Sequence, residues 1–459
     1  MKKIIGLFVI GVLCFSCKQN VEKPIDYAVL SGEITNKTGD FTLAAQDKSF
    51  KEIISIGEDG KFRDTLKVQP GLYMFYSGRN VTKVYLENGS NIVVNADVSN
   101  FSETVSFTGK GSEVCNYLEA KLKKEKELKG EGNTFFVLEE AEFKAKAKEI
   151  KSVLEKMVSE TEGISEDFVA KEKIELHYAY LSSLDFYNKY HSYYAKKPDY
   201  IASASFLEEL KSLDYSNEEH YKASPSYKNM VNSHIIELTQ KMSKEDSISF
   251  NMANIKAAAT LKNNYIKNDV LYSTAKMGIT FADDVKAYYK VFIDASTNED
   301  YRTEITETYD KLKTVAPGQP SPKFVDYENY AGGTTSLDDL KGKYVYIDIW
   351  ATWCGPCKAE IPFLQKVEKK YHGKNIEFVS ISVDKKEDHN KWKTMVKEKE
   401  LGGIQLFTGN DFNSKFIEDY FVMGIPKFIL LDPSGNIVKS SAPRPSDAKL
   451  IDLFNQLEI

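Results

Sequence analysis

The sequence Cys-Gly-Pro-Cys at residues 354–357 constrains this chain more than any other feature. An apolar, β-prone run precedes it at residues 344–350, and an amphipathic helical pattern follows it at residues 359–371. The spacing predicts that Cys354 and Cys357 lie on the first turn of a helix that follows a central strand. There, unpaired N–H groups and the helix dipole favour a thiolate at Cys354, and one sulfur can stay accessible while the pair forms a disulfide.

This placement suits thiol-disulfide exchange. The Cys354 thiolate would attack a substrate disulfide and form a mixed disulfide, which Cys357, one turn deeper, would resolve. Pro356 fits the early helix, where a missing N–H costs little.

Three other interpretations of the pair are weaker. A structural zinc site lacks a second Cys or His pair of suitable spacing, c-type haem attachment needs a histidine where Lys358 stands, and a static disulfide does not account for the surrounding strand and helix.

Strands and helices alternate after the cysteine pair. A segment with three prolines and a glycine at residues 314–322 opens the region. Strands are predicted at residues 376–383 and 427–431, and a helix at about 388–400. A Cys-x-x-Cys motif at a strand-to-helix junction within such alternation is typical of a thioredoxin-like redox domain, here at residues 315–459.

Residues 316–459 resemble the thioredoxin superfamily, specifically the membrane-tethered thiol-disulfide oxidoreductases of the TlpA/ResA type. The resemblance covers about a third of the chain and implies a thioredoxin-like α/β fold with thiol-disulfide oxidoreductase activity. The Gly-Pro between the cysteines is similar to that of thioredoxin, whose couple is strongly reducing at about −270 mV, so a reductase is expected. The motifs that carry the resemblance are Trp350-Ala351-Thr352-Trp353-Cys354-Gly355-Pro356-Cys357, Glu360 with Pro362, Gly424-Ile425-Pro426, and the upstream segment from Pro317 to Phe324.

The resemblance also implies roles for single residues. Pro426 would be a cis-proline that faces the disulfide, and Ile425 would offer backbone hydrogen bonds to an extended substrate segment. Asp348 falls where thioredoxins carry a buried acid beneath the second cysteine. Burial there should raise its pKa and let it relay a proton for Cys357. The alternative for Asp348 is a solvent-facing or capped carboxylate at a strand end.

Further positions complete the expected site. Trp353, Gly355 and Pro356 would form the substrate-facing surface around the nucleophilic sulfur, although packing alone would also explain the tryptophan. Ser380 departs from the family, because thioredoxins place a lysine there, facing the buried acid. The proton relay would therefore be tuned differently or use water. Glu360 matches a frequent family position, and stabilisation by the helix dipole explains it as well as a catalytic role does.

The N-terminus resembles a bacterial lipoprotein signal. Two lysines precede an apolar run at residues 4–15, which is too short for a permanent membrane span but suits a secretory signal. Cleavage would remove residues 1–16, and Cys17 would be acylated at the start of a polar tether, residues 17–26. An ordinary cleaved signal with a coincidental cysteine is the alternative. The resemblance implies a protein of the cell envelope that is lipid-anchored to a membrane and faces the periplasm.

The rest of the chain predicts a multidomain α+β protein. Short β-rich runs separated by Asp-Gly, Pro-Gly and Asn-Gly turns predict a sandwich-like domain at residues 27–110. Charged, Ala/Leu/Lys/Glu-rich patterns with helical spacing predict a helical region at residues 111–314. Neither region has a catalytic grouping in its sequence, and the lone Cys115 is expected to be a buried, inert thiol.

Together these features predict an envelope thiol-disulfide oxidoreductase that reduces disulfide-containing proteins. It would need a membrane electron donor, and the resemblance implies apo-cytochrome c as a substrate. We expect no metal and no cofactor beyond the cysteine pair, and a net charge of −6 argues against nucleic-acid binding. Two alternatives stay open. One is a thiol peroxidase, although Ala351 stands where peroxiredoxins carry Thr or Ser. The other is a binding or scaffolding lipoprotein with a secondary redox domain.

Overall fold

The computed structural model describes residues 25–45 and 49–459, so the predicted signal peptide, Cys17 and most of the tether lie outside the described residues. The chain forms two compact units, which divide between Lys211 and Ser212. This division falls within the predicted helical region, and the five-part domain organisation stays a prediction. Of the helices in the described ranges, none has both the length and the apolar character needed to cross a membrane.

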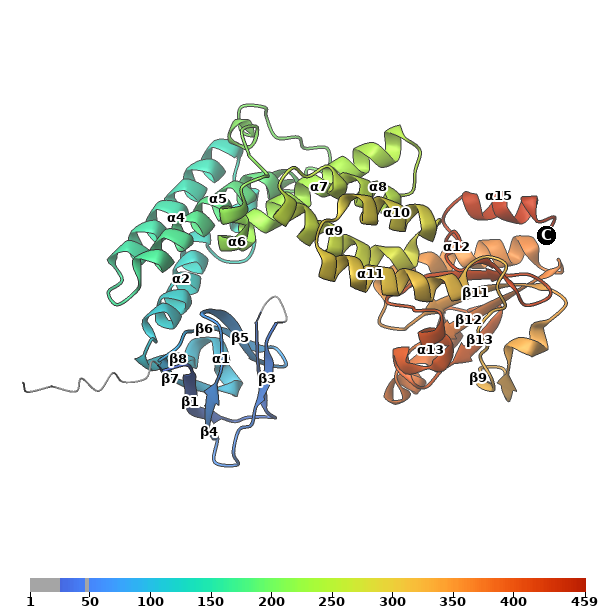
Figure 1. Ribbon diagram of the computed structural model, residues 1–459, viewed down its shortest axis with the longest axis horizontal. Helices are drawn as coiled ribbons and strands as arrows, with labels where there is room; N and C mark the ends of the chain where they lie inside the picture. The colour runs from blue at the N-terminus through green and yellow to red at the C-terminus, as the bar shows by residue number, and fades with distance from the viewer. Residues whose placement is uncertain (1–24, 46–48) are drawn as a thin grey trace, which may run out of the picture. The chain divides into compact units, whose positions relative to one another are not determined.

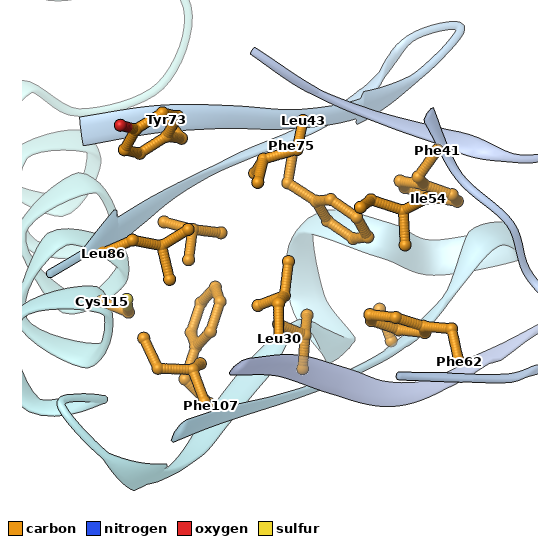
Figure 2. Packing of buried hydrophobic residues seen from close by; sticks show 14 of the residues in the cluster. Leu30, Phe41, Leu43, Ile54, Phe62, Tyr73, Phe75, Leu86, Phe107 and Cys115 are labelled. Atoms are coloured by element: carbon orange, nitrogen blue, oxygen red, sulfur yellow. The ribbon is translucent and has the colours of Figure 1, made fainter. Parts of the chain in front are cut away.

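The N-terminal unit begins with two four-stranded sheets, of order β4-β1-β7-β8 and β3-β2-β5-β6. Alternate side chains of the strands fill one hydrophobic core, in which Leu30, Phe41 and Phe75 are fully buried (Figure 2). Cys115 is part of this core, and burial raises the pKa of its thiol to about 11. The strands are β1 (Ala28–Thr35), β2 (Phe41–Ala45), β3 (Lys51–Ile54), β4 (Lys61–Leu66), β5 (Gly71–Ser77), β6 (Asn80–Leu86), β7 (Asn91–Asp97) and β8 (Ser106–Lys110).

Three long helices complete the N-terminal unit. Ser165 caps helix α5: its hydroxyl accepts a hydrogen bond from the Phe168 N–H and so satisfies one free donor of the first turn. Helices α4 and α5 pack together, and the rings of Phe143 and Tyr187 lie 4.4 Å apart between them. The helices are α2 (Glu113–Lys129), α4 (Glu140–Glu160) and α5 (Glu166–Tyr194), with the short η1 (Val98–Asn100), α1 (Phe101–Thr104), α3 (Thr134–Val137) and η2 (Glu208–Leu210).

The second unit opens with a helical part. Its helices begin where a side chain caps the first turn. Ser224, Ser249, Asn263, Asp284 and Asn298 each accept a hydrogen bond from a backbone N–H three residues later. The elements are α6 (Glu218–Ala223), α7 (Pro225–Glu245), α8 (Phe250–Ala259), α9 (Asn264–Gly278), η3 (Ile279–Phe281), α10 (Val285–Ala295), α11 (Glu299–Leu312) and η4 (Lys313–Val315).

A seven-stranded sheet of order β10-β9-β13-β12-β11-β14-β15 forms the C-terminal domain of this unit (Figure 1). Strands β11, β12 and β13 run parallel, and β14 pairs antiparallel with β11. The strands are β9 (Tyr327–Asn329), β10 (Thr334–Thr335), β11 (Tyr344–Trp350), β12 (Ile376–Ser382), β13 (Ile404–Phe407), β14 (Lys427–Leu431) and β15 (Ile437–Lys439).

Helices α12, α13 and α15 pack against this sheet. Helices α12 and α15 pack on one face, where Leu364 and Phe454 join Tyr346 and Phe428 in a buried cluster. Helix α13 places Trp392 against Phe407. The helices are η5 (Leu337–Leu340), α12 (Gly355–Tyr371), η6 (Lys386–Asp388), α13 (His389–Glu398), η7 (Asp411–Asn413), α14 (Lys415–Asp419) and α15 (Lys449–Gln456). The predicted fold class is confirmed: a β-rich start, a helical middle and a C-terminal α/β domain.

Candidate active site

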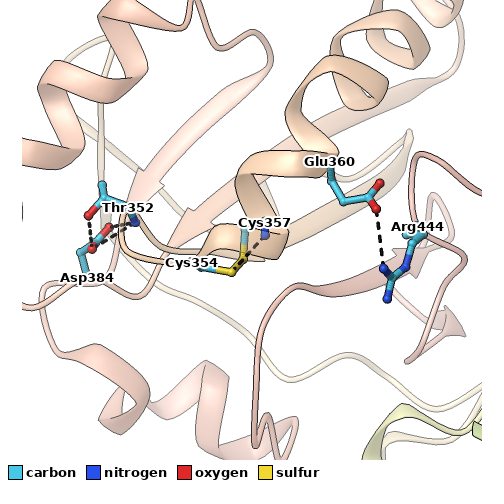
Figure 3. Close-up of a disulfide and its surroundings, with 6 residues drawn as sticks. All are labelled: Thr352, Cys354, Cys357, Glu360, Asp384 and Arg444. Carbon is cyan, nitrogen blue, oxygen red and sulfur yellow. Dashed lines mark hydrogen bonds and ion pairs between the residues drawn. A yellow bond between two sulfur atoms is a disulfide. The ribbon is translucent and has the colours of Figure 1, made fainter. Parts of the chain in front are cut away.

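Cys354 and Cys357 form a disulfide at the start of α12, directly after β11 (Figure 3). Their Cα atoms lie 5.3 Å apart. Cys354 is the N-cap residue, and its sulfur accepts a hydrogen bond of 3.1 Å from the Cys357 N–H. A thiolate at this position would therefore have a backbone donor and the positive end of the helix dipole beside it.

The sulfur of the N-cap residue is less accessible than the sequence predicts. Cys354 and Cys357 are each only 4% exposed in this disulfide form. The neighbouring Trp353 is 56% exposed, and Gly355 and Pro356 are also exposed. These three residues thus form the exposed surface next to the disulfide.

A buried carboxylate holds the loop that leads into Cys354. Asp384 accepts hydrogen bonds from the Thr352 N–H at 2.9 Å and from the Thr352 hydroxyl at 2.7 Å (Figure 3). The hydroxyl of Ser382 also donates to Asp384, at 2.7 Å. The sequence interpretation missed this contact. The available signal was an acid two residues after β12, because the carboxyl ends of neighbouring parallel strands meet at one edge of a sheet.

The Ile425–Pro426 peptide bond is cis, and both residues are half-buried. The next residue, Lys427, is buried, and its ammonium donates to the carbonyl oxygen of Thr280 in η3. Its Nζ also lies 5.3 Å from the centre of the Phe281 ring. The helical part of the second unit therefore packs directly beside the cis-proline loop, a contact that no sequence pattern indicated.

Burial lowers the pKa of Lys427 to about 7. A charged ammonium is poorly solvated in such a place, and the negative charge of Asp283 only partly offsets this effect.

Asp348 lies on β11, directly opposite Ser380 of β12. Ser380 is the residue that stands where thioredoxins place a lysine. The Oδ1 atom of Asp348 is buried and has no hydrogen-bond partner among the described residues. The pKa of Asp348 is raised to about 8, chiefly by burial, and further by the negative charges of Glu360 and Glu368. At neutral pH this carboxyl group holds its proton, so it can both take up and give up a proton near pH 8.

Glu360 ties α12 to the loop before α15. Its carboxylate accepts hydrogen bonds from the Ser446 N–H at 3.0 Å and from the Ser446 hydroxyl at 2.9 Å. The guanidinium of Arg444 lies 3.7 Å from it (Figure 3). Glu360 is 7% exposed, and these partners make it a structural contact that also adds negative charge near Asp348.

Comparison with known proteins places the similarity in this domain. Residues 317–440 match the model of the AhpC/TSA family. The thiol-disulfide oxidoreductase ResA of Bacillus subtilis is 28% identical over 148 residues, which is 32% of this chain and 78% of that protein. ResA of Bacillus cereus is 33% identical over 27% of this chain and 67% of its own length. The thioredoxin-like protein YneN of Bacillus subtilis is 32% identical, over 28% of this chain and 75% of that protein.

Among solved structures, the thioredoxin domain of a thiol-disulfide oxidoreductase from Bacteroides vulgatus is 30% identical to this chain. The match covers 31% of this chain and 97% of that domain, with a TM-score of 0.28.

Proposed function

This chain belongs to the thioredoxin-like family of thiol-disulfide oxidoreductases, and we propose that it reduces protein disulfides through Cys354 and Cys357 by way of a mixed disulfide. The observation that carries the proposal is the position of Cys354 at the N-cap of α12, with the Cys357 N–H directed at its sulfur. A thiolate forms most readily at this end of the helix. Cys354 is therefore the nucleophile of the pair.

The reaction runs in two displacements. The Cys354 thiolate attacks one sulfur of the substrate disulfide, which breaks the substrate S–S bond and releases the first substrate thiolate. Cys357 then loses its proton and attacks the Cys354 sulfur, which releases the second substrate thiolate and forms the Cys354–Cys357 disulfide. The substrate gains two electrons and the cysteine pair loses two. A membrane electron donor would restore the dithiol for the next cycle.

Asp348, in its ionised form, would accept the proton of Cys357 in the second displacement. Its raised pKa, about 8, lies close to the range in which a thiol and a carboxyl group exchange a proton at little cost. The family's lysine is absent at Ser380, so the acid has no cation opposite it on β12. Trp353, Gly355 and Pro356 would contact the substrate, and the backbone of Ile425 would hydrogen-bond to it beside the cis bond.

We also propose that acylation of Cys17 anchors the protein to an envelope membrane, with the redox domain facing the periplasm. The support is the sequence pattern of residues 1–17. In that compartment a reductase would act on proteins whose thiols must stay reduced, and apo-cytochrome c is such a substrate by family resemblance. Labelling with a radioactive fatty acid tests the anchor, because Cys17→Ser should abolish the label.

Trapping tests the assignment of the two cysteines. Cys357→Ser should hold a substrate on Cys354 as a mixed disulfide that thiol reagents release. Cys115→Ala is the control, because that thiol is buried in the N-terminal unit and its loss should leave the trapping pattern unchanged. Equal trapping by Cys354→Ser would show that the assignment of the nucleophile is wrong.

A further inference from the structure

A narrow cavity lies behind Cys357, between α12 and the sheet, with room for about one water molecule. Four residues of α12 line it at positions 4, 7, 8 and 11 after Cys357, which is one face of the helix. Strands β11, β12 and β13 supply the opposite wall. The polar residues of the lining are Asp348, Trp350, Ser380, Gln405, Gln365 and Glu368.

Three polar atoms of the lining residues have no partner. Asp348 Oδ1, Trp350 Nε1 and Gln405 Oε1 are buried, and within residues 25–45 and 49–459 nothing hydrogen-bonds to them. The amide nitrogen of Gln405 donates to the Gly402 carbonyl at 2.7 Å, which fixes the orientation of the group. Buried polar atoms in proteins are almost always paired with protein or with ordered water. The cavity therefore suits a water molecule in contact with Asp348.

Glu368 stands at the far end of this lining, about three helical turns after Cys357. Its carboxylate lies against the backbone of Gly402 and Gly403. A Cβ atom added at Gly402 would come within 2.5 Å of Glu368 Oε2, and one at Gly403 within 3.0 Å of Oε1. Two consecutive glycines thus leave the space that the carboxylate occupies. The residue is half-buried, so it connects the cavity with the surface.

The ionisable groups around the cavity are all acids or thiols. The cavity is lined by Cys357, Asp348 and Glu368. The negative charge of Glu360, which lies earlier in α12, also raises the pKa of Asp348. Strands β12 and β13 contribute only the neutral Ser380 and Gln405, and among the residues that the structure describes no lysine, arginine or histidine lines the cavity. Burial raises the pKa of Glu368 to about 7, and its charge adds to the raised pKa of Asp348. The two carboxyl groups therefore compete for protons in the same pH range.

We propose that Glu368 carries the proton of the second displacement between Asp348 and bulk solvent, through water held in this cavity. The inference rests on the proposed function, in which Cys357 gives its proton to Asp348. Asp348, which holds a proton at neutral pH, first passes that proton through the water to the Glu368 carboxylate and can then accept the proton of Cys357. Glu368 releases its proton to solvent, so each carboxyl group returns to its starting state. Glu368 does not touch the disulfide. It acts through Asp348, in place of the lysine that thioredoxins use.

The test separates the two displacements. Reduced protein is mixed with 5,5′-dithiobis(2-nitrobenzoate), whose coloured thiolate is released once by the attack of Cys354 and once more when Cys357 resolves the mixed disulfide. We expect Glu368→Gln to leave the first release unchanged and to slow the second about tenfold near neutral pH. That is less than the hundredfold or more of a direct general base, because Glu368 acts through another residue. The deficit should vanish at alkaline pH, where Cys357 ionises without a relay.

Two further variants supply a second perturbation of Glu368 and a control. Gly402→Ala displaces the carboxylate without removing it, since the new Cβ meets the end of a flexible side chain, and should slow the second release in the same way. Glu387→Gln is the matched control, an exposed glutamate of η6 in the same domain, and should change neither release. An unchanged second release in Glu368→Gln, or an equal loss in both releases at every pH, overturns the inference. A wild-type protein that releases no thiolate overturns the proposed function instead.

Discussion

Replacing Asp348 by asparagine removes the most strongly shifted acid of the C-terminal domain and should change how stability depends on pH. In the folded protein the carboxyl group keeps its proton up to a pKa of about 8, whereas the ordinary value is 3.8. Between these values the unfolded chain has lost the proton and the folded chain holds it. Wild-type stability therefore falls as pH rises through this window, and an asparagine, which does not titrate, escapes the loss.

The magnitude follows from the width of the window. Each pH unit within it costs about 1.4 kcal/mol, so the stability of Asp348→Asn relative to wild type should rise by about 4 kcal/mol between about pH 5 and about pH 8. The other shifted groups, including Glu368 and Lys427, are present in both proteins and largely cancel in this difference. A constant effect of the new amide group on packing also cancels, because only the change with pH is used.

Urea unfolding followed by tryptophan fluorescence is the suitable assay. The three tryptophans of the chain, Trp350, Trp353 and Trp392, all lie in the C-terminal domain, so the signal does not report the N-terminal unit. The control is Asp452→Asn, which replaces an exposed acid of the same domain by the same amide and should not show the rise of about 4 kcal/mol. If the stability of Asp348→Asn relative to wild type also fails to rise with pH, the reasoning about a buried, protonated acid is refuted.

Three other substitutions have defined outcomes. Lys427→Met should gain stability over wild type at neutral pH and lose about 4 kcal/mol of that advantage between about pH 7 and about pH 10, because only the unfolded wild type stays protonated there. Urea unfolding followed by tryptophan fluorescence checks this prediction, and a stability advantage of Lys427→Met that grows with pH would contradict it. Asp384→Asn should cost about 1.5 to 3 kcal/mol and slow substrate reduction, since the Thr352 hydrogen bonds lose a charged acceptor. Unchanged urea midpoints and rates would count against that role. Gly32→Ala should destabilise the N-terminal unit by about 1 to 3 kcal/mol or more, because the new Cβ would meet the Val94 carbonyl oxygen at 1.7 Å. In Gly32→Ala, urea unfolding followed by circular dichroism should begin at a lower urea concentration than in wild type, while the transition followed by tryptophan fluorescence stays unchanged. If both signals show one coincident transition at the wild-type midpoint, the prediction is refuted.

Local patterns predicted those parts of the fold that local forces decide. The apolar run before Cys354 became β11 and the amphipathic pattern after Cys357 became α12, because the period of the side chains decides which face each element buries. The order of a β-rich, a helical and an α/β region followed from the same patterns and is confirmed. The division of the helices between two units was not visible in the sequence, since it depends on which helices pack together rather than on how each one forms.

The site was predictable where chemistry and spacing coincide, and not where distant segments meet. Cys354 and Cys357 are three residues apart, and their pairing needs no tertiary information. The contact of Lys427 with Thr280 joins residues 147 positions apart, and its partner is a backbone carbonyl, which any residue type supplies. Glu368 appeared as one more charge on an amphipathic helix, because its surroundings depend on a glycine pair in a different loop.

The two sulfurs of the disulfide lie in electrostatically opposite surroundings, and this asymmetry gives the proposed order of the reaction a physical basis. Cys354 has the free end of α12 and a backbone N–H beside it, which stabilise negative charge. Cys357 faces a cavity lined by Asp348 and Glu368 and, within the described part of the chain, by no basic side chain, which favours a neutral thiol. In the proposed reaction the first sulfur would therefore attack, and the second would stay protonated until a neighbouring carboxylate takes its proton. A buried lysine near Asp348, at the position of Ser380, would stabilise a thiolate at Cys357 and weaken this distinction, so the serine there and the acids behind it act in the same direction.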